Sequence, residues 1–211
     1  MIGFYNYTVL LTYISLICSV VGITFAMSGR PLHALICLLV SGICDMFDGI
    51  IARTKTDRTE SEKKFGIEID SLSDLVCFGV LPAVIGFSLG LHEWFWRVIM
   101  VLYVLAALIR LAYFDVTEEQ RQKVESGCRK YYEGLPVTVT SVLFPFFYLF
   151  RGLIGHTFPH IYGCLLGVIA LCFVMRIKIF KPGHKFVFVS AVFGLLIIAA
   201  LITMKCFHLI K

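Results

Sequence analysis

Long apolar stretches separated by short polar segments dominate the pattern along this chain of 211 residues. A helix that crosses a bilayer needs about 20 apolar residues, because the hydrocarbon core is about 30 Å thick and each residue rises about 1.5 Å. The pattern therefore predicts an all-α chain, folded as a single polytopic membrane helix bundle over residues 1–211. The expected spans are 8–28, 32–52, 67–90, 94–114, 135–151, 158–176 and 186–204.

Composition supports the bilayer as the solvent of this fold. Hydrophobic residues make up 59% of the chain and charged residues 16%, whereas a soluble domain has about 45–50% and about 25%. A compact domain of this size cannot hide so much apolar surface from water. The composition therefore excludes an ordinary soluble globular protein.

The distribution of Lys and Arg predicts the orientation of the spans, because cytoplasmic loops are enriched in both residues. Fourteen of the nineteen lie on one side, after spans two, four and six. We therefore expect a cytoplasmic N-terminus, an external C-terminus and a location in the cell membrane. The net charge of +5 then reflects topology and contact with anionic lipids, not nucleic-acid binding.

Four aspartates lie within predicted spans, where a carboxylate near the bilayer centre costs about 2.5–3.5 kcal/mol. They are Asp45, Asp48, Asp70 and Asp74. On span 32–52, Asp45 and Asp48 share a helical face with Gly49 and Ala52, at i, i+3, i+4 and i+7. This spacing places two carboxylates beside small residues on one side of a helix.

The next span repeats the arrangement, with Gly66, Asp70 and Asp74 at i, i+4 and i+8. If the two faces meet, four carboxylates surround one cavity at the cytoplasmic face. Carboxylate oxygens are hard ligands that suit Mg²⁺ or Mn²⁺, and small residues let a phosphate-bearing ligand approach the backbone. Two such ions would clamp a pyrophosphate for an in-line displacement.

Two other interpretations of the carboxylates stay open. In the first, they form buried ion pairs with Arg53, Lys64 or Arg110. In the second, they line the pathway of a cation or proton transporter. The outer halves of the second and third spans (32–40 and 80–89) are almost wholly apolar, which argues against a continuous polar pathway.

These residues also carry a family resemblance. The segment Asp45-Met-Phe-Asp48-Gly49-Ile-Ile-Ala52-Arg53, followed by Gly66-Ile-Glu-Ile-Asp70-Ser-Leu-Ser-Asp74, resembles the signature DxxDGxxAR…GxxxDxxxD of the CDP-alcohol phosphatidyltransferases. Twelve residues separate Arg53 from Gly66, which is longer than the usual spacing. The extra stretch 57–62 is polar, and we expect it to lengthen a cytoplasmic loop.

Within that family, three further stretches resemble the phosphatidylserine synthases of bacteria and archaea. They are 70–83, Arg110-Leu-Ala-Tyr-Phe114 and Tyr132-Glu-Gly134-Leu-Pro136, with Tyr113 and Asp115 as departures from the pattern. The resemblance covers about 6–181 and implies a core of six helices, with 186–204 as an additional C-terminal transmembrane helix. It also suggests a homodimer.

The resemblance implies transfer of a phosphatidyl group from CDP-diacylglycerol to L-serine, with two divalent ions, Mg²⁺ or Mn²⁺, as cofactor. The four aspartates would be the metal ligands, and Asp74 would also be the catalytic base. Gly49, Ala52, Arg53 and Gly66 would bind CDP-diacylglycerol. Arg110, Gly134 and Pro136 would shape the acceptor site, where glycerol 3-phosphate or an inositol phosphate is the alternative to serine.

Asn6 and Thr8 precede the first span. They are expected to cap the helix that follows, with contact to the nucleotide as the alternative.

Overall fold

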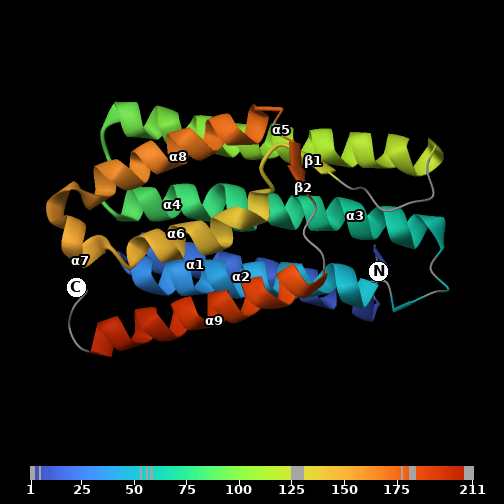
Figure 1. Ribbon diagram of the computed structural model, residues 1–211, viewed down its shortest axis with the longest axis horizontal. Coiled ribbons are helices and arrows are strands. Elements are labelled where there is room, and N and C mark those ends of the chain that lie inside the picture. Colours follow the sequence, from blue (N-terminus) through green and yellow to red (C-terminus); the bar gives the residue numbers. More distant parts are fainter. Residues whose placement is uncertain are drawn as a thin grey trace.

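The computed structural model is a bundle of helices that run along one common axis (Figure 1). It describes residues 3, 4, 6–52, 54, 55, 57, 59–124, 131–176, 178–180 and 184–206. The α-helices are α1 (Leu10–Met27), α2 (Pro31–Ala52), α3 (Glu60–Asp74), α4 (Leu81–Ser88), α5 (Trp94–Val124), α6 (Thr140–Tyr148), α7 (Arg151–Ile154), α8 (Phe158–Val174) and α9 (His184–Cys206).

Short elements connect or extend these helices. The 3₁₀-helices are η1 (Tyr7–Val9), η3 (Val137–Val139) and η4 (Gly155–Thr157), and the π-helix η2 (Leu75–Val80) joins α3 to α4. Strand β1 (Tyr131–Glu133) pairs antiparallel with β2 (Lys178–Phe180), with Tyr132 opposite Ile179. This small sheet joins the connection before α6 to the connection after α8.

Among the residues that the structure describes, five helical segments are long and apolar enough to cross a membrane. They are Tyr7–Met27, Pro31–Ile51, Glu60–Ser88, Trp94–Arg121 and Arg151–Val174. Two further apolar segments within the described side chains, Val137–Tyr148 and Val189–Thr203, are shorter, and the second is part of the 23-residue helix α9. The predicted all-helical membrane bundle is thus confirmed in its class, and five of the seven predicted spans have a counterpart of spanning length.

The boundaries of the predicted third and fifth spans differ from those observed. The third helical segment begins at Glu60, because a capping arrangement starts the helix well before its apolar part. The fifth predicted span, 135–151, contains only Val137–Tyr148 as continuous helix, since the chain turns at Leu149 and Phe150. Twelve helical residues rise about 18 Å, well short of the hydrocarbon core.

Small and hydroxyl side chains pack α1 against α2 in the interior of the bundle. The hydroxyl of Ser15 donates to the carbonyl of Ser41 at 3.2 Å, and the hydroxyl of Ser41 donates to the carbonyl of Ser15 at 2.9 Å. A methyl group at Gly22 would lie 2.9 Å from Cβ of Cys37. Apolar solvent provides no drive for helices to associate, so close backbone approach and interhelical hydrogen bonds hold this pair together.

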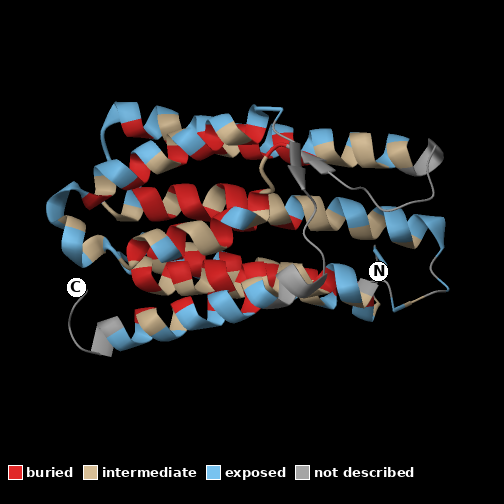
Figure 2. Ribbon diagram, in the orientation of Figure 1, coloured by how far each residue is buried: buried red, intermediate tan, exposed pale blue. Residues whose placement is uncertain are grey.

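Burial follows the contacts between helices (Figure 2). Buried residues gather where the helices face one another, with Tyr103, Phe144 and Tyr162 fully enclosed. Exposed side chains on the outer surface include many large apolar ones, among them Val101 and Leu171. A surface of this kind is stable in hydrocarbon and unstable in water, which agrees with a membrane location.

The first helix begins at the end of the bundle opposite to the one where α9 ends (Figure 1).

The capping role predicted for Asn6 is confirmed, because its side chain accepts a hydrogen bond from the backbone of Thr8 at the start of η1.

Candidate active site

The predicted carboxylate faces of α2 and α3 meet in the structure. Carboxylate oxygens of Asp45, Asp70 and Asp74 lie within 4.8 Å of one another. Asp48 is outside this group of three, but its carboxyl group lies near enough to that of Asp70 for the two charges to interact. All four carboxylates expected from the helical spacing therefore belong to one cluster.

Asp48 is the most buried of the four, with 7% of its surface exposed. The hydroxyl of Thr12 in α1 donates to Oδ2 of Asp48 at 3.2 Å, and the hydroxyl of Ser73 in α3 donates to the carbonyl of Thr12 at 3.4 Å. The first helix thus forms a third wall of the site. Sequence reasoning missed Thr12, because no local pattern relates it to the aspartates 36 residues further along the chain.

The donor set fits divalent cations. Oδ1 of Asp70 is buried and has no hydrogen-bond partner among the described residues, which leaves this oxygen available as a ligand. Two ionised carboxylates at these distances repel each other by about 3 kcal/mol at an effective dielectric constant near 20. Hard oxygen ligands with such repulsion suit Mg²⁺ or Mn²⁺, which would bind through Asp45, Asp48, Asp70 and Asp74.

The small residues next to the carboxylates leave the backbone accessible. A methyl group added to Gly49 would meet nothing within 4 Å, and this residue is exposed on the last turns of α2. Gly66 lies partly buried on α3, one turn before Asp70. Ala52 ends α2, while its side chain and the whole of Arg53 lie outside the described residues.

A capping box fixes the start of α3. The hydroxyl of Thr59 accepts from the backbone N–H of Glu62 at 3.2 Å, and the carboxylate of Glu62 accepts from the backbone N–H of Thr59 at 2.8 Å. The other carboxylate oxygen of Glu62 accepts from Lys55 at 3.1 Å and from the side-chain amide of Asn6 at 3.3 Å. Glu62 therefore joins the N-terminal segment, the α2–α3 connection and α3.

The polarity of the stretch 57–62 predicts a longer cytoplasmic loop, but part of this stretch is helical in the structure. Its last part, from Glu60, is the first turn of α3. The pattern Thr59-Glu-Ser-Glu62 is the sequence signal for such a start, since Ser or Thr followed three residues later by Glu forms a capping box.

A π-helical segment follows Asp74 directly. The hydroxyl of Tyr103 in α5 donates to the carbonyl of Phe78 at 2.6 Å within this segment. A methyl group at Gly79 would lie 3.1 Å from Leu75 and 3.4 Å from Ala107, so the helices approach closely here. These contacts fix the backbone immediately C-terminal to Asp74. Short π-helical turns of this kind are frequent at functional sites.

The predicted acceptor residues also come together. Arg110 in α5 is buried, and its Nε donates to the carbonyl of Leu135 at 3.2 Å. Gly134 has φ of +82°, and an added methyl group would lie 3.2 Å from the carbonyl oxygen of Phe173. Glycine is required there on both counts. Pro136 precedes η3 and so ends this turn.

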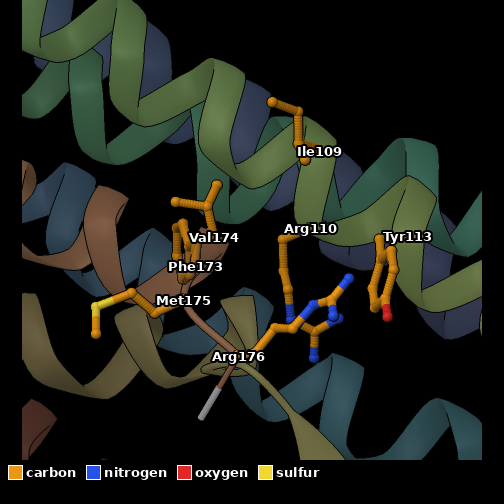
Figure 3. Close-up of a pocket in the computed structure, with 7 residues that line it drawn as sticks. All are labelled: Ile109, Arg110, Tyr113, Phe173, Val174, Met175 and Arg176. Carbon is orange, nitrogen blue, oxygen red and sulfur yellow. The ribbon is translucent and has the colours of Figure 1, made fainter.

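Arg110 also lines a pocket of about 190 Å³ between the end of α8 and the middle of α5 (Figure 3). Its guanidinium and that of Arg176 are directed toward the same part of the pocket (Figure 3). The other lining residues are Ile109, Tyr113, Phe173, Val174 and Met175. Sequence reasoning placed Arg176 only among the charges that set topology.

Known proteins are similar to this chain in sequence. The chain is 41% identical over 126 residues to the CDP-diacylglycerol–serine O-phosphatidyltransferase of Saccharomyces cerevisiae, which covers 56% of this chain and 43% of that protein. It is 34% identical over 128 residues to the archaetidylserine synthase of Methanothermobacter thermautotrophicus, covering 60% and 51%. A Helicobacter pylori CDP-diacylglycerol–serine O-phosphatidyltransferase is 32% identical over 143 residues, covering 66% and 55%.

These matches span about half the length of the curated relatives. The model of the CDP-alcohol phosphatidyltransferase family matches residues 5–175, which include the four aspartates and the turn from Gly134 to Pro136. The chain therefore belongs to the CDP-alcohol phosphatidyltransferase family.

Proposed function

We propose that this chain is a phosphatidylserine synthase, which transfers a phosphatidyl group from CDP-diacylglycerol to L-serine and releases CMP. The observation that carries the proposal is the cluster of Asp45, Asp48, Asp70 and Asp74 in a member of this family. The names of the relatives support serine as the acceptor, since two are serine O-phosphatidyltransferases and one is an archaetidylserine synthase.

The reaction is a displacement at phosphorus. The hydroxyl oxygen of serine forms a bond to the phosphorus on the diacylglycerol side of the pyrophosphate, and the bond from that phosphorus to the bridging oxygen breaks. CMP leaves with the electron pair, and the proton of the serine hydroxyl passes to Asp74. When bound, divalent ions would neutralise the charge that develops on the phosphate oxygens.

The residues of the chain provide position and basicity. Asp74 is the general base and shares a contact with Asp45, while Thr12 and Ser73 hold the α1 backbone and Asp48 in place. The open backbone around Gly49 gives room for the nucleotide half of the donor, together with Ala52, Arg53 and Gly66. Because the enzyme holds CDP-diacylglycerol and serine next to Asp74, the donor, the acceptor and the base react in a fixed orientation and need not meet by diffusion.

The acceptor site in this proposal is the turn of Gly134 and Pro136 with Arg110. The buried guanidinium of Arg110 donates to the carbonyl of Leu135 in this turn, and this hydrogen bond holds the guanidinium in one orientation. Guanidinium groups bind carboxylates with two parallel hydrogen bonds. A serine whose carboxylate is held there would have its hydroxyl free to meet the donor.

The proposal includes orientation and assembly. The cluster faces the cytoplasm, where serine and CDP-diacylglycerol are available, so the N-terminus is cytoplasmic and the C-terminus external. The excess of Lys and Arg at the same end as the cluster supports this orientation. The enzyme acts as a homodimer in the cell membrane, with six helices as the core and α9 as an addition.

The deciding experiment compares acceptors. Purified full-length protein receives CDP-diacylglycerol, Mg²⁺ and either L-serine, glycerol 3-phosphate or an inositol phosphate at equal concentration, and CMP release is followed. We expect serine to give the fastest release, with D-serine as the matched control. Faster release with glycerol 3-phosphate would overturn the acceptor, and no CMP release with any acceptor would favour the transporter interpretation.

Replacing Arg110 with Ala should lower kcat/KM for serine by about 10- to 100-fold, because a hydrogen bond to a charged group contributes about 1.5–3 kcal/mol. The loss should appear mainly in the KM for serine, while CDP-diacylglycerol binding stays within about twofold, since the donor is held by other residues. Arg110→Lys should recover only part of it, because an ammonium cannot form the bidentate contact.

The matched control is Arg97→Ala, in the first turn of the same helix, where Nε donates to the carbonyl of His92. It should leave both constants unchanged. An unchanged KM for serine in Arg110→Ala would remove this residue from the acceptor site and leave the carboxylate chemistry intact.

A further inference from the structure

The pocket with two arginines continues into an apolar groove along the outer surface of the bundle. This groove, of about 250 Å³, lies between α5 and α8 and shares Ile109 and Val174 with the pocket. Its lining is wholly apolar, and consists of Ile99, Leu102, Leu105, Ala106, Ile109, Gly167, Ala170, Leu171 and Val174. The cationic pocket and the apolar groove thus form one continuous surface.

The groove is deep because small residues form its floor. Ala106 and Ala170 are buried between the helices, and a methyl group at Gly167 would meet only Ile99, at 3.7 Å. The walls are large residues that remain half exposed, such as Leu102 and Leu171. A long, thin and apolar ligand fits between such walls.

The length of the groove matches one leaflet. The rise along α5 from Ile99 to Ile109 is about 15 Å at about 1.5 Å per residue. The hydrocarbon core of a bilayer is about 30 Å thick, so one layer of acyl chains occupies about 15 Å. Both helices belong to segments of spanning length. The groove is therefore long enough to hold one acyl chain across a single leaflet.

One end of this surface carries positive charge. Arg176 follows the end of α8, is exposed, and makes no ion pair within the part of the chain that the structure describes. The buried guanidinium of Arg110 forms the inner wall of the same pocket (Figure 3). The guanidinium of Arg110 already donates to the carbonyl of Leu135, so Arg176 is the cation in this pocket that an anion would neutralise.

We propose that this surface is a binding site for an anionic phospholipid, distinct from the carboxylate cluster. The phosphodiester contacts the guanidinium of Arg176, because Arg110 is assigned to the acceptor site, and one acyl chain fills the groove between α5 and α8. A free anion would use the cationic pocket but not the apolar groove, and a second copy of the chain would use the groove but not the pocket. A lipid with an anionic headgroup and an acyl chain would use both. This inference goes beyond the proposed function and requires no catalysis.

The test measures lipid binding to the purified full chain by native mass spectrometry, with phosphatidylglycerol and phosphatidylcholine of identical acyl chains. The wild-type protein should bind phosphatidylglycerol at least about fivefold more tightly, since one basic residue near the membrane contributes about that factor toward anionic lipid. Arg176→Gln should remove this preference and Arg176→Lys should keep most of it. Arg97→Gln, which removes the same charge at the far end of α5, should change nothing.

The groove is tested by Gly167→Leu, which places a side chain where the acyl chain would lie. It should weaken binding of both lipids severalfold, whereas Ala199→Leu, on the exposed face of α9, should not. Thermal unfolding of each variant identifies one that fails to fold, and Gly167→Ala then serves as the milder replacement. Equal affinity of the wild type for both lipids would overturn the proposal. So would a Gly167→Leu protein that loses self-association but keeps its lipid binding.

Discussion

Replacing Asp74 with Asn should lower the turnover of CMP release by about 10²–10⁴-fold, the range that a positioned general base contributes. The amide keeps the size of the side chain and one oxygen ligand, but it cannot accept the proton of the serine hydroxyl. Binding of CDP-diacylglycerol should therefore change much less than turnover. Single-turnover CMP release and a separate donor-binding titration measure the two effects.

The matched control is Asp57→Asn, in the exposed connection between α2 and α3. It makes the same chemical change outside the cluster and should leave turnover within about twofold, as surface substitutions usually do. Asp45→Asn provides a second comparison, since it removes a ligand without removing the base. Near-normal CMP release by Asp74→Asn would exclude Asp74 as the base.

Removal of divalent ions should abolish turnover in the wild-type protein, and Mg²⁺ or Mn²⁺ should restore it. The physical reason is the repulsion among carboxylates whose oxygens lie within 4.8 Å of one another, next to a pyrophosphate that adds more negative charge. The measurement is CMP release after exhaustive treatment with EDTA, followed by titration with each ion. Full turnover after chelation would overturn the proposed metal site.

Metal binding should also be visible without any substrate. A ligand that binds only the folded protein raises its stability by about 2.7 kcal/mol at a concentration 100 times its Kd. Thermal unfolding in detergent should therefore shift upward with Mg²⁺, and not with KCl at equal ionic strength. Asp70→Asn should reduce this shift, because Oδ1 of Asp70 is a buried oxygen of the cluster without a hydrogen-bond partner among the described residues.

The features of the site that depend on helical periodicity could be predicted from the sequence. Asp45 and Asp48 on one helix, and Asp70 and Asp74 on the next, share faces because of their spacing alone. Their meeting needed only that neighbouring helices pack with their polar faces together, away from lipid. The glycine at 134 could likewise be singled out by the family pattern, and its positive φ gives the physical reason.

Features that depend on tertiary contacts could not be predicted. The hydrogen bond from Thr12 to Asp48 joins residues 36 positions apart, and the pocket of Arg110 and Arg176 joins the middle of α5 to the end of α8. The fifth span was predicted too long because hydropathy stays high through Leu149 and Phe150, where the chain turns without any polar residue. Hydropathy reports the solvent of a segment, not its direction.

The π-helical segment after Asp74 changes the phase of the third membrane segment. A π-turn accommodates one residue more than an α-turn, so the helix resumes at Leu81 rotated by about 100° relative to an uninterrupted α-helix. The helix before this segment, α3, presents its carboxylates to α2. The helix after it, α4, presents Leu81 and Ile85 to the buried core. The two helices of one span therefore direct different faces to their neighbours. The polar face that α3 needs for the carboxylates does not determine which face of α4 packs in the core.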